Sequence, residues 1–253
     1  MKFVKLISVS TALFILSGCV VHVNAQRADV ELQETLTLQT SNLTNFDIDA
    51  GAGSLKIVGV EGANSIEVSA EILTTEERNY TLTLTKSGST AKLVAEHDSH
   101  SGYWKGSSPQ INLTITMPNS MMLNVDDGSG DLEISKINNS VKLDDGSGDA
   151  MVEYITGDLW IDDGSGELSV RQVVGKVSID DGSGELVIAN IDGDVNVEDG
   201  SGDLSILDVS GTVTIDDGSG SINLNGAGGL KIIESGSGGL QISNVSGSVD
   251  IES

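Results

Sequence analysis

An 18-residue repeat occupies the second half of the chain and restricts the folds that this chain can adopt. The phrase Asp-Asp-Gly-Ser-Gly, or a close variant of it, returns at intervals of 18 residues. A period this regular indicates that each unit is one turn of a stacked structure, so that neighbouring units bury one another. The phrase begins at Asp126, Asp144, Asp162, Asp180, Glu198, Asp216 and, in eroded form, Glu234.

Each unit consists of two related nonapeptides. Numbered from Val177, the unit has apolar residues at positions 1, 3, 10, 12 and 15 and glycine at positions 8 and 17. Each half therefore supplies one short strand, whose successive side chains point to opposite faces. We predict an all-β fold, a parallel β-solenoid with 18-residue coils. We expect a right-handed winding, because crossover connections between parallel strands overwhelmingly have that hand.

A left-handed hexapeptide helix also has 18-residue coils, but it requires an apolar residue at every sixth position. Position 9 is Asp or Glu in five of the seven units and is never apolar, which excludes that helix. The glycines at positions 8 and 17 are expected to serve the scaffold, because glycine adopts backbone angles that other residues resist. Asn139 is the only exception at position 17, and Asn tolerates left-handed geometry best among the other residues.

The region from 31 to 118 is irregular but has the alternation of β-strands and no helical periodicity. Residues 46–60 resemble a degenerate repeat, with Asp-Ala-Gly-Ala-Gly in place of Asp-Asp-Gly-Ser-Gly. We therefore expect an N-terminal β region of degenerate coils and a cap over 31–118, followed by the repeat solenoid over 119–253.

The start of the chain resembles an export signal. Lys2 and Lys5 provide positive charge, and an apolar run follows to Leu16. We predict a signal peptide over 1–18. Its removal takes away two lysines and no acids, so the net charge changes from −25 to −27.

The segment Leu-Ser-Gly-Cys that ends at Cys19 resembles a bacterial lipobox, in which the cysteine takes a lipid and becomes the new N-terminus. We predict lipidation of Cys19, with residues 19–30 as a tether to the membrane. Cys19 is the only cysteine, so no disulfide can form within the chain. Because Val20 follows, where an Asp would resemble an inner-membrane retention signal, we expect an outer-membrane lipoprotein of the cell envelope, facing the periplasm or the cell surface.

The charge of the chain limits its partners. A net charge of −25 argues against nucleic acid, whose phosphates require a basic face. No cofactor is indicated with certainty, and we predict no catalytic residues. A pair of carboxylates can hydrolyse glycosides, but a pair repeated in six coils indicates architecture rather than one active site.

Three interpretations of the repeated acids remain open. The carboxylates are solvated or accept hydrogen bonds from turn amides, or they hold Ca²⁺ between coils, or they form a strip that binds a cationic partner or a cation-bridged glycan. The motif matches neither an EF-hand nor the nonapeptide calcium β-roll. The candidate calcium ligands are Asp126, Asp127, Asp144, Asp145, Asp162, Asp163, Asp180, Asp181, Glu198, Asp199, Asp216 and Asp217.

Four aromatic residues are candidate contacts for a protein or glycan partner. Tyr103 and Trp104 belong to an expected loop after the early strands, and Tyr154 and Trp160 interrupt a pattern of small outward residues. Exposed aromatic side chains are common at binding interfaces. Tyr154 and Trp160 are expected to mark one contact patch, unless each covers a neighbouring side chain.

The lipobox, the strand "INLTITMP" and the apolar rungs with Gly-acid-Leu-x-Ile that follow resemble the bacterial putative-adhesin family of β-strand repeats, which is related to the toast-rack domains of envelope-stress proteins. The resemblance covers roughly residues 30–253. It implies a non-enzymatic β-solenoid of the cell envelope and supplies no catalytic residues.

We therefore expect an adhesin-like binding or structural module. The alternatives are a periplasmic stress-sensing or scaffolding protein and a calcium-dependent solenoid that binds or acts on glycans. The final coil around 240–253 shows no polar cap, so we also expect self-association through it.

Overall fold

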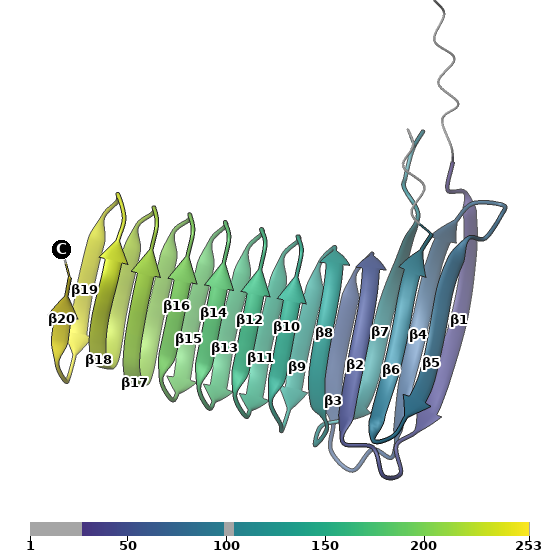
Figure 1. The fold of residues 1–253 in the computed structure, drawn as a ribbon, viewed down its shortest axis with the longest axis horizontal. Helices are drawn as coiled ribbons and strands as arrows, with labels where there is room; N and C mark the ends of the chain where they lie inside the picture. The colour runs from purple at the N-terminus through teal and green to yellow at the C-terminus, as the bar shows by residue number, and fades with distance from the viewer. Residues whose placement is uncertain (1–26, 99–103, 253) are drawn as a thin grey trace, which may run out of the picture.

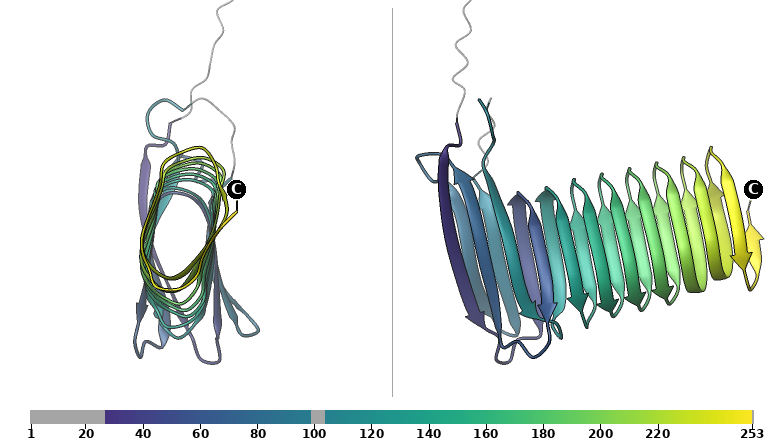
Figure 2. Two further views of the ribbon diagram at one scale, coloured as in Figure 1. Left: turned by 90° about the vertical axis from the view of Figure 1, so that its left-hand side faces the viewer. Right: turned by 180° about the vertical axis from the view of Figure 1, so that it is seen from behind.

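The computed structural model describes residues 27–98 and 104–252, and this part of the chain forms β-strands and no helix. The strands wind into a flattened tube whose successive coils stack along one axis (Figures 1 and 2). The predicted parallel β-solenoid is confirmed. Two layers of strands face each other across the tube, and the apolar rungs of every coil fill the space between them.

One layer carries the repeated acids, and we call it the acidic sheet. Its first pair, β5 and β6, is antiparallel, and every later pair is parallel. In spatial order it contains β5 (Tyr80–Ser87), β6 (Thr90–His97), β2 (Asn45–Ala52), β8 (Met122–Ser129), β10 (Val141–Asp145), β12 (Leu159–Asp163), β14 (Val177–Asp181), β16 (Val195–Asp199), the second halves of β17 (Leu204–Asp217) and β18 (Ile222–Ser235), and β20 (Val249–Ile251).

The second layer, which we call the opposite sheet, begins with two antiparallel pairs and is parallel thereafter. Strands β17 and β18 are continuous around the corner and contribute to both layers. In spatial order the opposite sheet contains β1 (Val30–Gln39), β4 (Ser65–Thr74), β7 (Gln110–Pro118), β3 (Leu55–Val60), β9 (Leu132–Ile137), β11 (Ala150–Thr156), β13 (Leu168–Val174), β15 (Leu186–Asp192), the first halves of β17 and β18, and β19 (Leu240–Val245).

The 18-residue period appears directly in the strand register. Val141 pairs with Leu159, and Leu168 pairs with Leu186, so each apolar residue stacks on its equivalent in the next coil. These rungs are buried; Val141, Leu159 and Leu186 have none of their surface exposed. Since each coil covers the apolar rungs of its neighbour, stability depends on stacking rather than on any single coil.

The likeness of residues 46–60 to the repeat is confirmed by their pairing. In the acidic sheet Phe46 lies opposite Leu123 of β8, and in the opposite sheet Leu55 lies opposite Leu132 of β9. On their other side, β2 and β3 pair with β6 and β7. This early segment is therefore a coil placed between two coils that come much later in the chain.

The regular spacing fails in the coil that contains β18. Thr212 pairs with Gly229, one residue fewer than the period, and the period returns where Asp216 pairs with Glu234. The 18-residue period places Gly229 at position 17, as the equivalent of Gly211, and this placement is wrong because Gly229 pairs with Thr212. The shortened corner is compensated by one extra residue before Glu234, which leaves Ile233 41% exposed.

The second glycine of the Gly-Ser-Gly turn is required by two separate constraints. The backbone φ of Gly166 is 146°, which side chains with a Cβ rarely adopt. A Cβ at this position would also lie 1.7 Å from the carbonyl oxygen of Gly148 in the preceding coil. The sequence predicted the special backbone angle of this glycine. Close stacking of the coils is a second reason why no side chain fits here.

A second special position was not predicted. The residue at position 14 has positive φ in seven successive coils. It lies near the end of each strand of the opposite sheet, shortly before the chain crosses to the acidic sheet. Only some of these residues are Asn, Asp or Gly, the types that tolerate such angles. The seven residues are Lys136, Tyr154, Gln172, Asn190, Asp208, Gly226 and Asn244.

Replacing Gly166 by Ala is expected to lower the free energy of unfolding by about 3 kcal/mol, because overpacking and an unfavourable φ both contribute. Gly239→Ala is the matched control, since a Cβ at Gly239 meets no atom within 4 Å. Thermal and urea unfolding of both variants would measure the difference. Equal stability of the two variants would contradict the close approach at Gly166.

Candidate functional site

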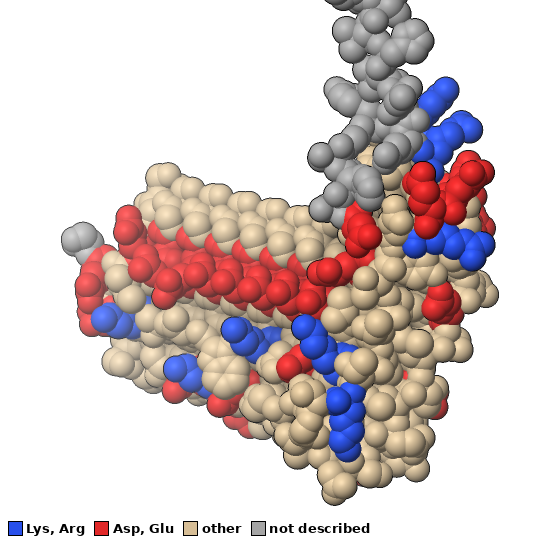
Figure 3. Space-filling model, turned by 45° about the vertical axis from the view of Figure 1, so that its right-hand side comes forward, with Lys and Arg blue, Asp and Glu red and all other residues tan. Residues whose placement is uncertain are grey.

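The first acid of each repeated pair faces solvent. Strand alternation directs this side chain outward from the acidic sheet, and the parallel register places it beside its equivalent in the next coil. Figure 3 shows the resulting acidic stripe along the solenoid. We call this set the outward acid row: Asp126, Asp144, Asp162, Asp180, Glu198, Asp216 and Glu234.

The second acid of each pair points into the tube, next to the Gly-Ser-Gly turn. All six of these side chains are buried, with 0–4% of their surface exposed. The row ends where Ala50 pairs with Asp127 and where Ser235 pairs with Asp217. We call this set the inward acid row: Asp127, Asp145, Asp163, Asp181, Asp199 and Asp217.

The turn amides satisfy only part of the inward acid row. The backbone N–H of Ser165 donates to Oδ1 of Asp163 over 3.1 Å, which is the turn-capping arrangement that the sequence allowed. Oδ2 of Asp163 and both carboxyl oxygens of the other five inward acids have no partner at full hydrogen-bond geometry, although in each of those five a turn amide lies near enough to lower the pKa of the carboxyl group. These groups are therefore buried polar atoms with unmet hydrogen-bonding capacity.

Burial raises the pKa of every carboxyl group in the inward row. For Asp127 and Asp181, burial and then the neighbouring carboxylates raise the pKa to about 7. The same causes raise the pKa of Asp145 and Asp199 to about 6. Burial also raises the pKa of Asp163 and Asp217; the hydrogen bond from the Ser165 amide to Asp163, and the nearby Ser219 amide beside Asp217, act against this rise.

Acids elsewhere in the repeat have a structural role that the sequence did not reveal. The carboxylate of Asp149 accepts a hydrogen bond from the backbone N–H of Glu167, 18 residues later, over 3.1 Å. Asp158 accepts one from the N–H of Lys176 over 2.9 Å. These acids at positions 9 and 18 join successive coils at the corners.

The predicted calcium ligands lie in two parallel rows rather than in compact clusters. Within residues 27–98 and 104–252, no three His, Cys, Asp or Glu side chains form a group that could hold a metal ion. A calcium ion between coils would need further oxygen ligands, because Ca²⁺ takes six to eight. Calcium binding by the twelve acids stays a prediction.

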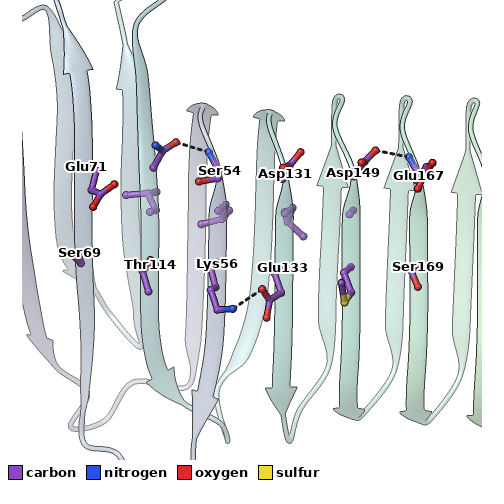
Figure 4. A pocket seen from close by; sticks show the side chains of 16 residues that line it. Ser54, Lys56, Ser69, Glu71, Thr114, Asp131, Glu133, Asp149, Glu167 and Ser169 are labelled. Carbon is purple, nitrogen blue, oxygen red and sulfur yellow. Dashed lines mark hydrogen bonds and ion pairs between the residues drawn. The ribbon is translucent and has the colours of Figure 1, made fainter. Parts of the chain in front are cut away.

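A groove of about 640 Å³ crosses the outer face of the opposite sheet, and the sequence did not predict it. Its lining comes from β4, β7, β3, β9, β11 and β13, so segments far apart in the chain meet there (Figure 4). Leu55, Leu113 and Leu132 at its base are buried, whereas Met151 in the lining is 44% exposed.

The groove is acidic. Five acids line it, and Lys56 is its one cation. The Nζ of Lys56 lies 2.6 Å from Oε2 of Glu133, so this ion pair neutralises one of the five. The lining acids are Glu71, Asp131, Glu133, Asp149 and Glu167.

The two aromatic candidates of the repeat region do not form one contact patch. Trp160 is 43% exposed on β12 of the acidic sheet, and Tyr154 is 45% exposed on β11 of the opposite sheet. The prediction of one contact patch shared by Tyr154 and Trp160 is wrong, because the corner between them places them on different layers. Trp104 is half-buried, and Tyr103 lies outside the described residues.

The C-terminal coil exposes residues that correspond to core positions elsewhere. Leu240 pairs with the buried Ile222, and Val249 pairs with the buried Leu230. Their exposed fractions are 42% and 52%, because no further coil covers them in the structure. Self-association through this coil stays a prediction.

The predicted signal peptide and Cys19 also lie outside the described residues. Within the described part of the chain, no helix has the length and apolar character needed to cross a bilayer. Lipidation of Cys19 therefore stays a prediction from the sequence.

The coil architecture agrees with comparisons to known proteins. Residues 63–253 match the family model described as Toastrack DUF4097. The chain belongs to this family. Membership in the Toastrack family is consistent with an adhesin-like module. No curated protein matches the chain.

This Toastrack chain is also similar to solved structures. One is described as a "putative adhesin" from Bacteroides fragilis NCTC 9343, with a TM-score of 0.50 and 14% identity over 89% of this chain and 99% of that one. Another, also described as a "putative adhesin", comes from Parabacteroides distasonis ATCC 8503, with a TM-score of 0.49 and 14% identity over 90% of this chain and 100% of that one. At this identity the likeness to the Bacteroides structure shows the fold alone.

Tyr154→Gly is expected to raise the free energy of unfolding by about 1 kcal/mol, because glycine removes the cost of a φ of 57°. Tyr154→Ala is the control, since it removes the same ring and keeps a Cβ. Chemical denaturation of both variants would measure the effect. A Gly variant no more stable than the Ala variant would contradict strain at this position.

Proposed function

We propose that the protein is a non-enzymatic, adhesin-like binding module of the cell envelope, held to the outer membrane by a lipid on Cys19. The observation that carries this proposal is the outward acid row. It presents one carboxylate per coil at a constant spacing, because the parallel register of the acidic sheet stacks each of these acids on its equivalent in the next coil.

The outward acid row has the electrostatic properties of a surface for a cationic partner. Neighbouring carboxylates at a strand spacing of about 4.8 Å repel each other by roughly 0.9 kcal/mol in water. Among the described residues, no Lys or Arg forms an ion pair with an acid of the outward row. A partner rich in Lys or Arg would relieve this repulsion. We therefore propose a cationic protein segment as the ligand.

The alternative function is periplasmic scaffolding or stress sensing, and the third is calcium-dependent glycan binding. The first alternative shares the fold and differs in location. The second requires a divalent cation to bridge the carboxylates and an anionic glycan.

The mature chain, made as the soluble Cys19→Ser variant, is expected to bind a lysine-rich peptide in a salt-dependent manner. Replacing four acids of the outward row by Asn should weaken binding at least about tenfold, because several charge contacts are lost together. Calorimetric titration at two salt concentrations would measure both effects. The four positions are Asp126, Asp144, Asp162 and Asp180.

A control variant removes the same number of charges from exposed acids outside the outward row and the groove, and it should change the affinity less than about twofold. An equal loss of affinity in both variants would show that binding depends only on the net charge of the chain and not on the outward row. The control positions, each changed to Gln, are Glu31, Glu61, Glu76 and Glu77.

Protease treatment of intact cells is expected to remove the protein from the outer surface. Cys19→Ala should release it from the membrane fraction, because a single change removes the site of the proposed lipid anchor. Immunoblots of whole and fractionated cells would measure both outcomes. Complete protection from protease in intact cells, with degradation after permeabilisation, would favour the periplasmic alternative.

A further inference from the structure

The inward acid row places six carboxyl groups in the buried corner of the solenoid without a matching set of partners. Asp181 and Asp217 have none of their surface exposed, and the carboxyl oxygens of each have no partner at full hydrogen-bond geometry, with only a turn amide nearby. The groups are adjacent, because the parallel register stacks Asp163 on Asp181 and Asp181 on Asp199. Such a row is costly if every member is ionised, since like charges repel strongly away from water.

The charged groups around the row are all acidic. Asp181 has Asp163 and Asp199 as neighbours from β12 and β16, and Asp180 lies beside it on its own strand. At the ends of the row, Asp126 acts on Asp127, and Glu234 acts on Asp217. Asp145 has Asp144 as the corresponding neighbour on its own strand, and Asp163 has Asp162.

The strands that follow the turn begin with uncharged residues facing the core: Leu132, Ala150, Leu168, Leu186, Leu204 and Ile222. Within the described part of the chain, the three ion pairs involve none of the inward acids. The surroundings therefore offer no Lys, Arg or His as a counter-charge. Neutral carboxyl groups are the form that this environment favours.

We propose that the inward acid row is a proton-binding ladder, in which a protonated carboxyl of one coil donates a hydrogen bond to the carboxylate of the next. In Asp163, Oδ1 accepts a hydrogen bond from the turn amide and Oδ2 has no partner, which leaves Oδ2 free for the neighbouring coil. Folding then takes up protons, and acidification stabilises the solenoid.

The direction of the pH dependence follows from the pKa values. The pKa of Asp181 is about 7 in the folded chain, whereas that of an unfolded Asp is near 3.9. Between these values the folded state binds more protons than the unfolded state, so stability falls as pH rises. The loss is complete once pH exceeds the folded pKa. The midpoint of thermal unfolding should therefore be higher at pH 5 than at pH 8.

Surface repulsion in so acidic a chain also weakens at low pH, so a matched pair of variants is needed. Asp181→Asn removes one inward charge, keeps an acceptor for the turn amide and adds a donor toward Asp163 or Asp199. It should raise the unfolding midpoint at pH 8 by about 5 °C and reduce the difference between pH 5 and pH 8. Asp180→Asn removes the exposed neighbour in the same coil and should leave that difference nearly unchanged.

The ladder can also be observed directly, from the ¹³C chemical shifts of the Asp carboxyl groups in the full mature chain. A group of Asp signals should titrate between about pH 5 and 8, well above the usual range. In Asp181→Asn, the neighbouring signals should titrate at lower pH, because one source of repulsion is gone. If Asp181 had a purely structural role, its replacement would leave the titration midpoints of the neighbouring Asp signals unchanged.

Three results would overturn the proposal. The first is titration of every Asp carboxyl below pH 5. The second is an equal pH dependence in Asp181→Asn and the unmodified chain. The third is a Ca²⁺-specific rise in the unfolding midpoint at pH 8 that Mg²⁺ does not produce and that Asp181→Asn abolishes, because calcium would then balance the row in place of protons.

Discussion

Backbone pairing between successive coils is the interaction on which the rest of the structure depends. The ladder fixes the spacing of the coils, and that spacing leaves no room for a Cβ at Gly166 beside the carbonyl of Gly148. The same pairing stacks Val141 on Leu159, so that short strands acquire a continuous core. Neither half of a repeat could bury its apolar residues alone.

The same pairing also brings like charges together, and the chain handles them in three ways. Asp126 and its equivalents project into water, where repulsion is weakest. Asp149 and Asp158 accept hydrogen bonds from the next coil and so turn an acid into a connection between coils. Asp181 and its equivalents are buried, and burial together with the neighbouring carboxylates favours the neutral form of the carboxyl group. Acidic residues at different positions of the repeat thus have different physical roles.

The fold was predictable because the apolar spacing seen from Val177 to Ile191 is compatible with few structures. It was harder to predict that the first acid of each pair points outward and the second inward. That prediction requires the alternation of side chains along the strand to continue through Asp180 and Asp181 up to the turn. Nothing in the residue types marks Lys136 or Tyr154 as left-handed. The slip at Gly229 depends on a corner that the repeat pattern does not encode.

The groove was not predictable from sequence patterns, because Lys56, Asn112 and Glu167 meet only through sheet order. That sheet order has a consequence for assembly. Strands β2 and β3 are synthesised early, yet their neighbours include β6 and β7 on one side and β8 and β9 on the other. Long-range pairing of this kind must wait until the intervening chain exists. The first coil in sequence is thus completed only after about half of the chain has been made, and later coils can then add one at a time.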